Sequence, residues 1–521
     1  MSSNHAEDAG SREPLLAAQH RPAADDAEQA PASTTTFVRN LGAAEVFAIV
    51  IGIVIGSGVF TSPGAIDTNV PSPAVGLVVW LVGGVLAWTG ASTFAELGTA
   101  IPGEGGVQPY LKRVYGDVWG FLAAWTWIVA VMPATLAILS IVFVESAYSV
   151  AGVTDESARL SHKLLSILVL AVMTVGNCIS TKASTRLNGF FVVLKFVTIF
   201  LVVVAALAVV GIQAAHPHRH DVGGDDWFRK SWFAYRRTVN PDGSETDWHH
   251  VSQWEMLGHF SAALYGALWA YSGWDKAIYV TSELSDPARQ LPLALNTSIP
   301  TVIACFLVAN AAYYILLPWN LVSTTDSVAV TAITSLLGRG FGIVAAVLIC
   351  LVVAGSLLGN SFVASRMTVS AANRTWFPKT FAIVGRVGLK PPGDSDAAGG
   401  SDAPINALIL SAVLSTLYIL FGNFRALLTL NGLGEYSFFF LTVLGAVILR
   451  YREPDLKRPY KPAIINPLIF IVVSGFVVVR GAVFAPVQAV VVVAIWGLGL
   501  VYYWAKRRWL DDSEPAMAQD E

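Results

Sequence analysis

The sequence predicts an all-α membrane protein with 12 transmembrane helices, two of them interrupted at mid-span. Of its 521 residues, 54% are hydrophobic and only 13% are charged, a balance far from that of a soluble domain. Apolar stretches recur along most of the chain, and roughly 20 residues suffice to cross a bilayer as a helix. Two of these stretches contain glycines at their centres, in residues 56–58 and at Gly273.

Each predicted span is a continuous apolar stretch bounded by polar or charged residues. We expect spans at 43–66, 74–99, 118–149, 164–181, 186–211, 256–281, 298–318, 340–363, 404–421, 425–449, 464–483 and 486–505. They form one transmembrane domain, 41–506, followed by a short C-terminal tail, 507–521. Residues 1–40 are rich in Asp, Glu, Ala and Pro, which predicts a disordered tail and no cleavable signal peptide.

Positive charges near the span ends predict that both termini are cytoplasmic. With this orientation the cytoplasmic loops hold most of the basic residues: Lys112, Arg113, Lys182, Arg186, Arg366, Arg374, Lys379, Arg386, Lys390, Arg450, Arg452, Lys457, Arg458, Lys461, Lys506, Arg507 and Arg508. The opposite side holds Arg159, Lys163 and the long mixed segment 212–254. The net charge of −3 shows no basic excess typical of nucleic-acid binding.

The two interrupted spans predict a solute site at membrane depth. Glycines there loosen the helix and expose backbone groups, which in lipid cost several kcal/mol each unless a polar group meets them. Half-helix N-termini favour a carboxylate, and free carbonyls favour an ammonium group. The breaks lie in the first and sixth predicted spans, as in an inverted five-plus-five repeat. The two halves are at about 43–211 and 256–449, followed by two peripheral helices at 464–505. The pattern is typical of a secondary transporter.

Several short motifs, in order along the chain, carry a family resemblance. They are residues 56–63 (GSGVFTSP), 94–99 (FAELGT), 103–106 (GEGG), 268–275 (LWAYSGWD), 279–284 (YVTSEL), 291–294 (LPLA), 365–366 (SR) and 450–459 (RYREPDLKRP). The ordered set resembles the amino acid–polyamine–organocation (APC) superfamily, and within it the L-type amino acid transporter family in a fungal-type form. The resemblance implies a LeuT-like fold and uptake or exchange of amino acids.

The resemblance also implies substrate-binding residues at the two breaks. Backbone amides at Gly56, Ser57 and Gly58, with the Ser57 hydroxyl, are expected to hold the substrate carboxylate. Carbonyls of Val54 and Ile55, and of residues at the second break, are expected to hold its ammonium group. The second-break residues are Trp269, Ala270, Tyr271 and Ser272, and Trp269 occupies the position of a gating aromatic. Close packing through small residues is the structural alternative for the glycines.

Three ionisable residues inside predicted spans are candidates for the side-chain pocket or for coupling. Lys195 matches a lysine of sodium-independent relatives whose ammonium replaces a structural sodium ion; the alternative is a lysine that snorkels to the membrane surface. Glu435 binds a cationic side chain, relays a proton, or caps a helix N-terminus after two glycines. Asp275 is either a pocket acid or the partner of Lys276 or of a helix end.

Other charged groups are expected to serve gates rather than the substrate. Glu45, Glu96 and Glu283 lie near span ends, and Arg366 is expected to pair with one of them in an inner gate. The histidines at 216, 218 and 220 are most simply a solvated loop. Cys178, Cys305 and Cys350 all fall in spans, and no metal or cofactor is predicted.

The sequence leaves the substrate and the energetics open. Neutral, medium-to-large L-amino acids are favoured, with cationic amino acids or polyamines as the alternative. Proton symport, exchange and uniport all fit. A non-transporting amino acid sensor is the alternative of another class, and an enzyme is disfavoured because no nucleophile–base or metal set is present. Residues 151–163 contain no cysteine, so no disulfide-linked heavy chain is expected; the plasma membrane is the expected location.

Overall fold

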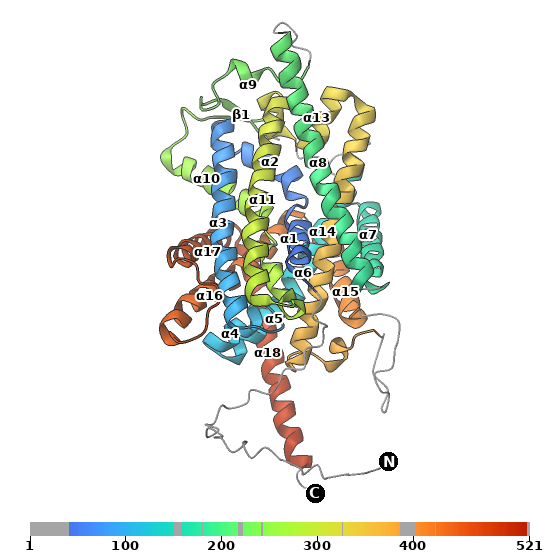
Figure 1. The fold of residues 1–521 in the computed structure, drawn as a ribbon, viewed down its shortest axis with the longest axis vertical. Coiled ribbons are helices and arrows are strands. Elements are labelled where there is room, and N and C mark those ends of the chain that lie inside the picture. The colour runs from blue at the N-terminus through green and yellow to red at the C-terminus, as the bar shows by residue number, and fades with distance from the viewer. Residues whose placement is uncertain are drawn as a thin grey trace, which may run out of the picture. The chain divides into compact units, whose positions relative to one another are not determined.

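The computed structural model describes residues 41–150, 159–179, 181–216, 222–240, 243–325, 327–385, 403–422 and 424–517. These residues form a helical bundle with one two-stranded hairpin (Figure 1). The predicted disordered tail, 1–40, lies outside them, as do His218, His220, Arg386 and Lys390 from the sequence-based predictions.

The elements follow one another along the chain as named in Figure 1. The first half contains α1 (Ala43–Val54), α2 (Gly58–Asp67), α3 (Pro73–Ala100), α4 (Val107–Tyr115), α5 (Asp117–Thr126), the π-helix η1 (Trp127–Val131), α6 (Met132–Val150), α7 (Leu160–Ile179), α8 (Thr181–Ala215), α9 (Asp226–Arg229), β1 (Arg237–Val239) and β2 (Glu245–Asp247). The second half contains α10 (Gln253–Ala270), the 3-10 helix η2 (Trp274–Glu283), α11 (Pro287–Leu316), α12 (Trp319–Thr324), α13 (Val328–Leu337), α14 (Arg339–Asn373), the 3-10 helix η3 (Lys379–Ala382), α15 (Ile405–Phe421), α16 (Phe424–Arg452), α17 (Ile465–Phe484) and α18 (Pro486–Met517).

Within the described residues, nine helices are long and apolar enough to cross a membrane, or ten when α1 and α2 are counted as one bent span. The predicted sixth span falls on α10 and η2, and the predicted ninth on α15, which has 17 residues. Neither meets the length and composition expected of a continuous span. The count of twelve therefore remains a prediction.

The first glycine-containing break separates α1 from α2. The two helices bend by 44° across residues 55–57. Ile55 leaves the helical region (φ −75°, ψ 79°), and the Gly56 amide bonds back to the Val54 carbonyl at 2.8 Å. The helical hydrogen-bond pattern is thus interrupted at the position where the sequence predicted a break.

The second break follows α10. This helix begins with a capping box in which the Ser252 hydroxyl accepts from the Glu255 amide while the Glu255 carboxylate accepts from the Ser252 amide. It ends at Ala270, and Gly273 has φ +111°, a left-handed conformation that glycine adopts without strain. A Cβ at Gly273 would also lie 2.5 Å from Ile53 Cγ2. Conformation and space both require glycine here.

The two ends of α3 define the two ends of the bundle used below. Ser72 caps α3 with Pro73 at its first turn, and the Ala74 amide bonds to the Trp232 carbonyl at 3.1 Å, beside the β1–β2 hairpin. We call this the hairpin end. The helix runs 28 residues to Ala100, close to α4 in the chain, at what we call the α4 end (Figure 1).

Several helices extend beyond their predicted spans, among them α18, which continues to Met517 instead of 505 and into the predicted C-terminal tail. α11 begins at Pro287 instead of 298, and α14 continues to Asn373 instead of 363. Hydropathy detects only the apolar part of a helix, and backbone hydrogen bonding continues through polar residues at its ends. The short helix α4 contains Lys112 and Arg113 in its last turn.

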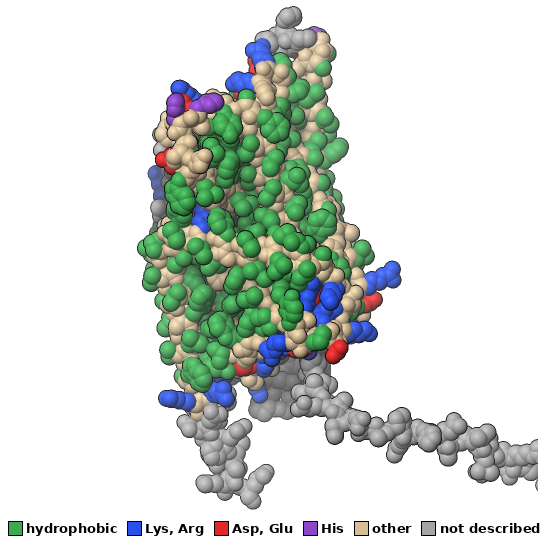
Figure 2. Space-filling model, turned by 90° about the vertical axis from the view of Figure 1, so that its left-hand side faces the viewer, with side chains coloured by type: hydrophobic (Ala, Val, Ile, Leu, Met, Phe, Trp, Pro, Cys, Tyr) green, Lys and Arg blue, Asp and Glu red, His purple; other side chains and the backbone are tan. Residues whose placement is uncertain are grey.

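Large aromatic side chains fill the interior between α3, α10 and α11. The Trp80 ring lies edge-on to the Phe306 ring and the Tyr271 ring, with centroids 5.5 Å and 6.0 Å apart. On the outside, hydrophobic side chains cover the middle of the visible face, and charged side chains gather toward its two ends (Figure 2). This distribution is that of a bilayer-embedded surface.

Candidate functional site

A cavity lies between the two helix breaks. It is bordered by residues of α1, α2, α6, α10, η2, α14 and α16. Its lining residues are Ile53, Val54, Gly56, Ser57, Gly58, Thr135, Leu139, Trp269, Ala270, Ser272, Gly273, Lys276, Asn360, Asn431 and Glu435.

The α2 side of the cavity presents backbone N–H groups. The first hydrogen bonds of α2 are donated by the amides of Phe60 and Thr61, both to the Ser57 carbonyl at 2.9 Å. The amides of Ser57, Gly58 and Val59 precede these bonds, at the helix start where N–H groups lack intrahelical partners. Such a start suits an anion such as a carboxylate.

The two breaks approach each other closely at Gly58. A Cβ on this glycine would lie 2.7 Å from Ala270 Cα and 2.9 Å from Ala270 Cβ. Only a residue without a side chain lets the start of α2 meet the end of α10 at this distance. The two interpretations of these glycines, close helix packing and exposed helix-end amides, are therefore compatible.

Lys195 lies behind the first break and does not line the cavity. Its side chain is 0% exposed, and its ammonium group donates to the Gly52 carbonyl and, at 2.7 Å, to the Ser356 hydroxyl. Ser356 in turn donates to the Gly52 carbonyl at 3.0 Å. This burial excludes the alternative of a lysine that snorkels to the membrane surface.

A cluster of three charged side chains lies at the cavity, and two of them, Lys276 and Glu435, line it. The Lys276 ammonium lies 2.7 Å from a carboxylate oxygen of Asp275 and 2.7 Å from one of Glu435. The other Glu435 oxygen accepts from the Ser272 hydroxyl at 2.9 Å. The interpretation of Glu435 as a helix N-terminal cap is wrong, because the residue lies well inside α16, which begins at Phe424. Asp275 is the partner of Lys276, one of the two roles left open by the sequence.

The comparisons with known proteins agree with this geometry. The family model "Amino acid permease" matches residues 41–505. The chain belongs to the amino acid permease family. The chain is 28% identical over 481 residues to b(0,+)-type amino acid transporter 1 of Rattus norvegicus, covering 91% of this chain and 90% of the relative. It is 26% identical over 504 residues to large neutral amino acids transporter small subunit 2 of Mus musculus, covering 96% and 88% respectively.

This permease is a transporter of the APC superfamily and not an enzyme. Its family implies the LeuT-like fold. No group of three His, Cys, Asp or Glu side chains suited to a metal ion occurs within the described parts of the chain.

Most sequence-predicted residues of the permease site meet at the cavity. Val54, the 56–58 glycine–serine run, Trp269, Ala270, Ser272 and Glu435 line it, whereas Ile55, Tyr271, Asp275 and Lys195 lie outside the lining. Sequence reasoning missed the following lining residues: Ile53, Thr135, Leu139, Gly273, Lys276, Asn360 and Asn431. Polar residues inside apolar spans were the signal that could have found Asn360 and Asn431.

Ion pairs lie toward the α4 end of the permease. The Arg366 guanidinium donates to Glu283 at 3.1 Å, and both side chains are 4% exposed. Glu96 pairs with Arg450 and, at 3.2 Å, with Arg458. Of the three acids proposed as partners of Arg366, Glu283 is the one it contacts. Glu45 instead accepts from the Gly42 amide at the start of α1.

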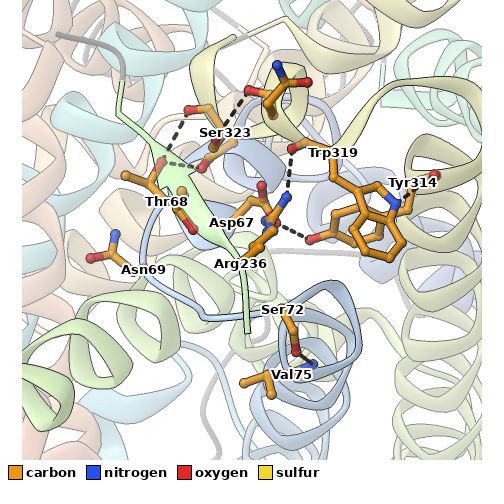
Figure 3. A network of polar contacts seen from close by, with 12 residues as sticks. Asp67, Thr68, Asn69, Ser72, Val75, Arg236, Tyr314, Trp319 and Ser323 are labelled. Carbon is orange, nitrogen blue, oxygen red and sulfur yellow. Dashed lines mark hydrogen bonds and ion pairs between the residues drawn. The ribbon is translucent and has the colours of Figure 1, made fainter. Parts of the chain in front are cut away.

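A second polar network lies at the hairpin end of α2. Arg236, in the segment between α8 and α10, donates to Asp67 at the last position of α2 and to the Trp319 carbonyl. The Tyr314 hydroxyl donates to the same Asp67 oxygen at 2.6 Å. Figure 3 shows Arg236 between Asp67 and Trp319, with Tyr314 directed toward Asp67. A buried ion pair thus follows each helix break along the chain, Asp67–Arg236 after the first and Glu283–Arg366 after the second.

Proposed function

We propose that this permease is a sodium-independent secondary transporter of neutral, medium-to-large L-amino acids, of the L-type family, that works by alternating access. The single observation that carries the proposal is the cavity between the two breaks, where helix-start amides face the end of α10. The amides of Ser57 and Gly58, with the Ser57 hydroxyl, would hold the carboxylate. The Gly56 amide, also expected to do so, instead bonds the Val54 carbonyl. Carbonyls at the breaks would hold the ammonium group, although the Val54 carbonyl already accepts from Gly56.

Neutral substrates are supported by the walls around the remaining space. Leu139 and Trp269 offer apolar surface, and Thr135, Asn360 and Asn431 offer uncharged polar groups. A cationic amino acid or polyamine is the alternative. It is disfavoured because the Lys276 ammonium lines the cavity and already pairs with Glu435. One relative is named a transporter of large neutral amino acids.

Sodium independence is supported by Lys195. Its ammonium group bonds the Gly52 carbonyl and the Ser356 hydroxyl next to the first break. A sodium ion bound by the same oxygens would also link α1 to α14. Because the Lys195 ammonium is part of the polypeptide, this link does not require sodium from outside.

The plasma membrane with both termini in the cytoplasm is part of the proposal. Basic residues at the α4 end include Lys112, Arg113, Arg450, Arg452 and Arg458. The hairpin end holds Arg229, Lys230, Arg236 and Arg237, fewer than the α4 end, to which Arg366, Arg374 and Lys506 also belong. The bias favours the α4 end as the cytoplasmic side. No disulfide-linked heavy chain is expected, because residues 151–163 contain no cysteine.

Uptake by purified permease in liposomes tests the proposal. A panel of labelled L-amino acids would be compared with and without sodium, an inward proton gradient, and internal amino acid. Sodium-independent uptake of leucine- and methionine-sized neutral substrates supports the proposal. Uptake confined to arginine, lysine or polyamines favours the cationic alternative, and binding without uptake favours a sensor.

A further inference from the structure

The charged cluster at the cavity contains three formal charges that do not cancel; Lys276 and Glu435 line the cavity, and Asp275 lies behind Lys276. One ammonium group, Lys276, faces two carboxylates, Asp275 and Glu435, and their side chains are 3%, 0% and 2% exposed. With all three ionised, the cluster carries one net negative charge. Burying an uncompensated charge is very unfavourable, and such a site gains a counter-charge or a proton instead.

No other cation compensates the cluster within the part of the chain that the structure describes. The other titratable side chains that interact electrostatically with its carboxylates are tyrosines: Tyr265 from α10, Tyr279 from η2 and Tyr436 from α16. A tyrosine is uncharged at neutral pH. Arg480 of α17 lies over the Tyr265 ring at 5.3 Å and donates to Ser261, and Lys195 bonds Gly52 and Ser356.

The cluster is also in contact with the transport cavity. Glu435, Lys276 and Ser272 all line it. Ser272 belongs to the second break and donates to Glu435 at 2.9 Å. Ser272 therefore connects the two sites. It belongs to the break where the substrate would bind, and its hydroxyl bonds a carboxylate of the cluster that would take up the proton.

We propose that the Asp275–Lys276–Glu435 cluster binds one proton together with the substrate and makes the permease a proton-coupled symporter. The proposal rests on the proposed function, since it needs a neutral amino acid in the same cavity. The proton adds to a carboxylate oxygen of the Asp275–Glu435 pair from the side with higher proton concentration and leaves on the other side. A proton suits this site better than a cationic side chain, which would meet the Lys276 ammonium.

Steady-state accumulation in liposomes tests the coupling. The membrane potential is held at zero with potassium and valinomycin, and an inward gradient of one pH unit is imposed. Wild-type permease should accumulate a neutral amino acid about tenfold, because one pH unit is equivalent to about a tenfold ratio at one proton per substrate. Glu435→Gln mimics the protonated acid. The ratio of internal to external amino acid should therefore fall to about one, while exchange of labelled for internal substrate continues.

Three further variants keep the test decisive. Asp275→Asn removes the other carboxylate and should uncouple in the same way, which covers the case in which Glu435→Gln does not fold. Glu453→Gln alters a partly exposed ion pair with Arg113 and should leave the accumulation ratio unchanged. Lys195→Gln addresses the other buried amine; if it uncouples while Glu435→Gln does not, the proposal is overturned.

The outcomes separate this proposal from the proposed function. Wild-type exchange without gradient-driven accumulation overturns the proton site and leaves the transport of neutral amino acids intact. Accumulation retained in both Glu435→Gln and Asp275→Asn also overturns it. Absence of any binding or exchange of neutral amino acids overturns the proposed function itself.

Discussion

Arg236 and Asp67 form a buried ion pair across 169 residues of sequence. It ties the segment between α8 and α10 to the last residue of α2, the half-helix whose start borders the cavity. Burial by itself lowers the pKa of Arg236, but the Asp67 carboxylate beside it outweighs that effect and holds the pKa of the guanidinium above its ordinary value. The Arg236 guanidinium is therefore charged at neutral pH.

Arg236→Met should destabilise the permease by about 3–5 kcal/mol, because it leaves the Asp67 carboxylate buried without its partner. Unfolding in detergent, followed by tryptophan fluorescence, measures the change. The double variant Asp67→Asn with Arg236→Met should recover part of the loss.

The neighbouring Arg237 provides a matched control. Its side chain is 69% exposed and lies 3.4 Å from Asp247, so Arg237→Met should change stability by less than about 1 kcal/mol. Equal losses for the two arginine variants would contradict a special role for the buried pair.

Asp226 should make the hairpin end sensitive to acid. Its carboxylate lies 2.8 Å from the Lys230 ammonium and accepts from the Trp319 amide at 2.9 Å. Partial burial raises the pKa of Asp226, but the bonds from Lys230 and Trp319 outweigh this and lower it. A lowered carboxyl pKa stabilises the fold above the ordinary Asp pKa, and this contribution is lost as the pH falls through the lowered value.

Asp226→Asn should reduce stability by about 1 kcal/mol at neutral pH and weaken the decline in stability from about pH 5 downward. Melting curves across this range measure both effects. Glu245→Gln, at a side chain 54% exposed, serves as control and should leave the curve nearly unchanged. An acid profile of Asp226→Asn identical to that of the wild type would rule out this role.

Gly58→Ala should abolish or weaken substrate binding by at least about tenfold, a loss near 1.4 kcal/mol. The added methyl group would lie 2.7 Å from the Ala270 Cα and push the two breaks apart. Binding of a labelled amino acid to purified permease measures the loss. Gly258→Ala in α10 is the control, because nothing lies within 4 Å of a Cβ there, and it should bind normally. Normal binding by Gly58→Ala would show that this contact does not shape the site.

Lys195→Met should reduce uptake by about tenfold or more. It removes two hydrogen bonds from a charged donor, to the Gly52 carbonyl and the Ser356 hydroxyl, and hydrogen bonds of this kind contribute about 1.5–3 kcal/mol each. Initial uptake rates in sodium and in choline buffers measure the effect. Lys163→Met removes a lysine that donates to the Leu420 carbonyl at 2.7 Å and should transport normally. Sodium-dependent uptake by the wild type would refute the role assigned to Lys195.

The amino-acid sequence alone determined most helix positions and both helix breaks. Apolar stretches predicted helices at most of the positions where they occur, and glycines predicted both breaks, because hydropathy and backbone freedom are properties of short segments. Helix ends were less accurate, as at α11 and α14, where helices continue through polar residues. The hairpin of β1 and β2 was not predicted.

Tertiary structure decided which charged groups meet. Lys276 and Glu435 are 159 residues apart, and Glu283 and Arg366 are 83 apart; such pairings depend on how helices pack and leave no periodic trace in the sequence. The same holds for the polar lining from α6, α14 and α16. The sequence therefore determined where the two helices are interrupted. Packing decided which side chains surround these breaks, because buried charges require partners of opposite charge that lie far away in the sequence.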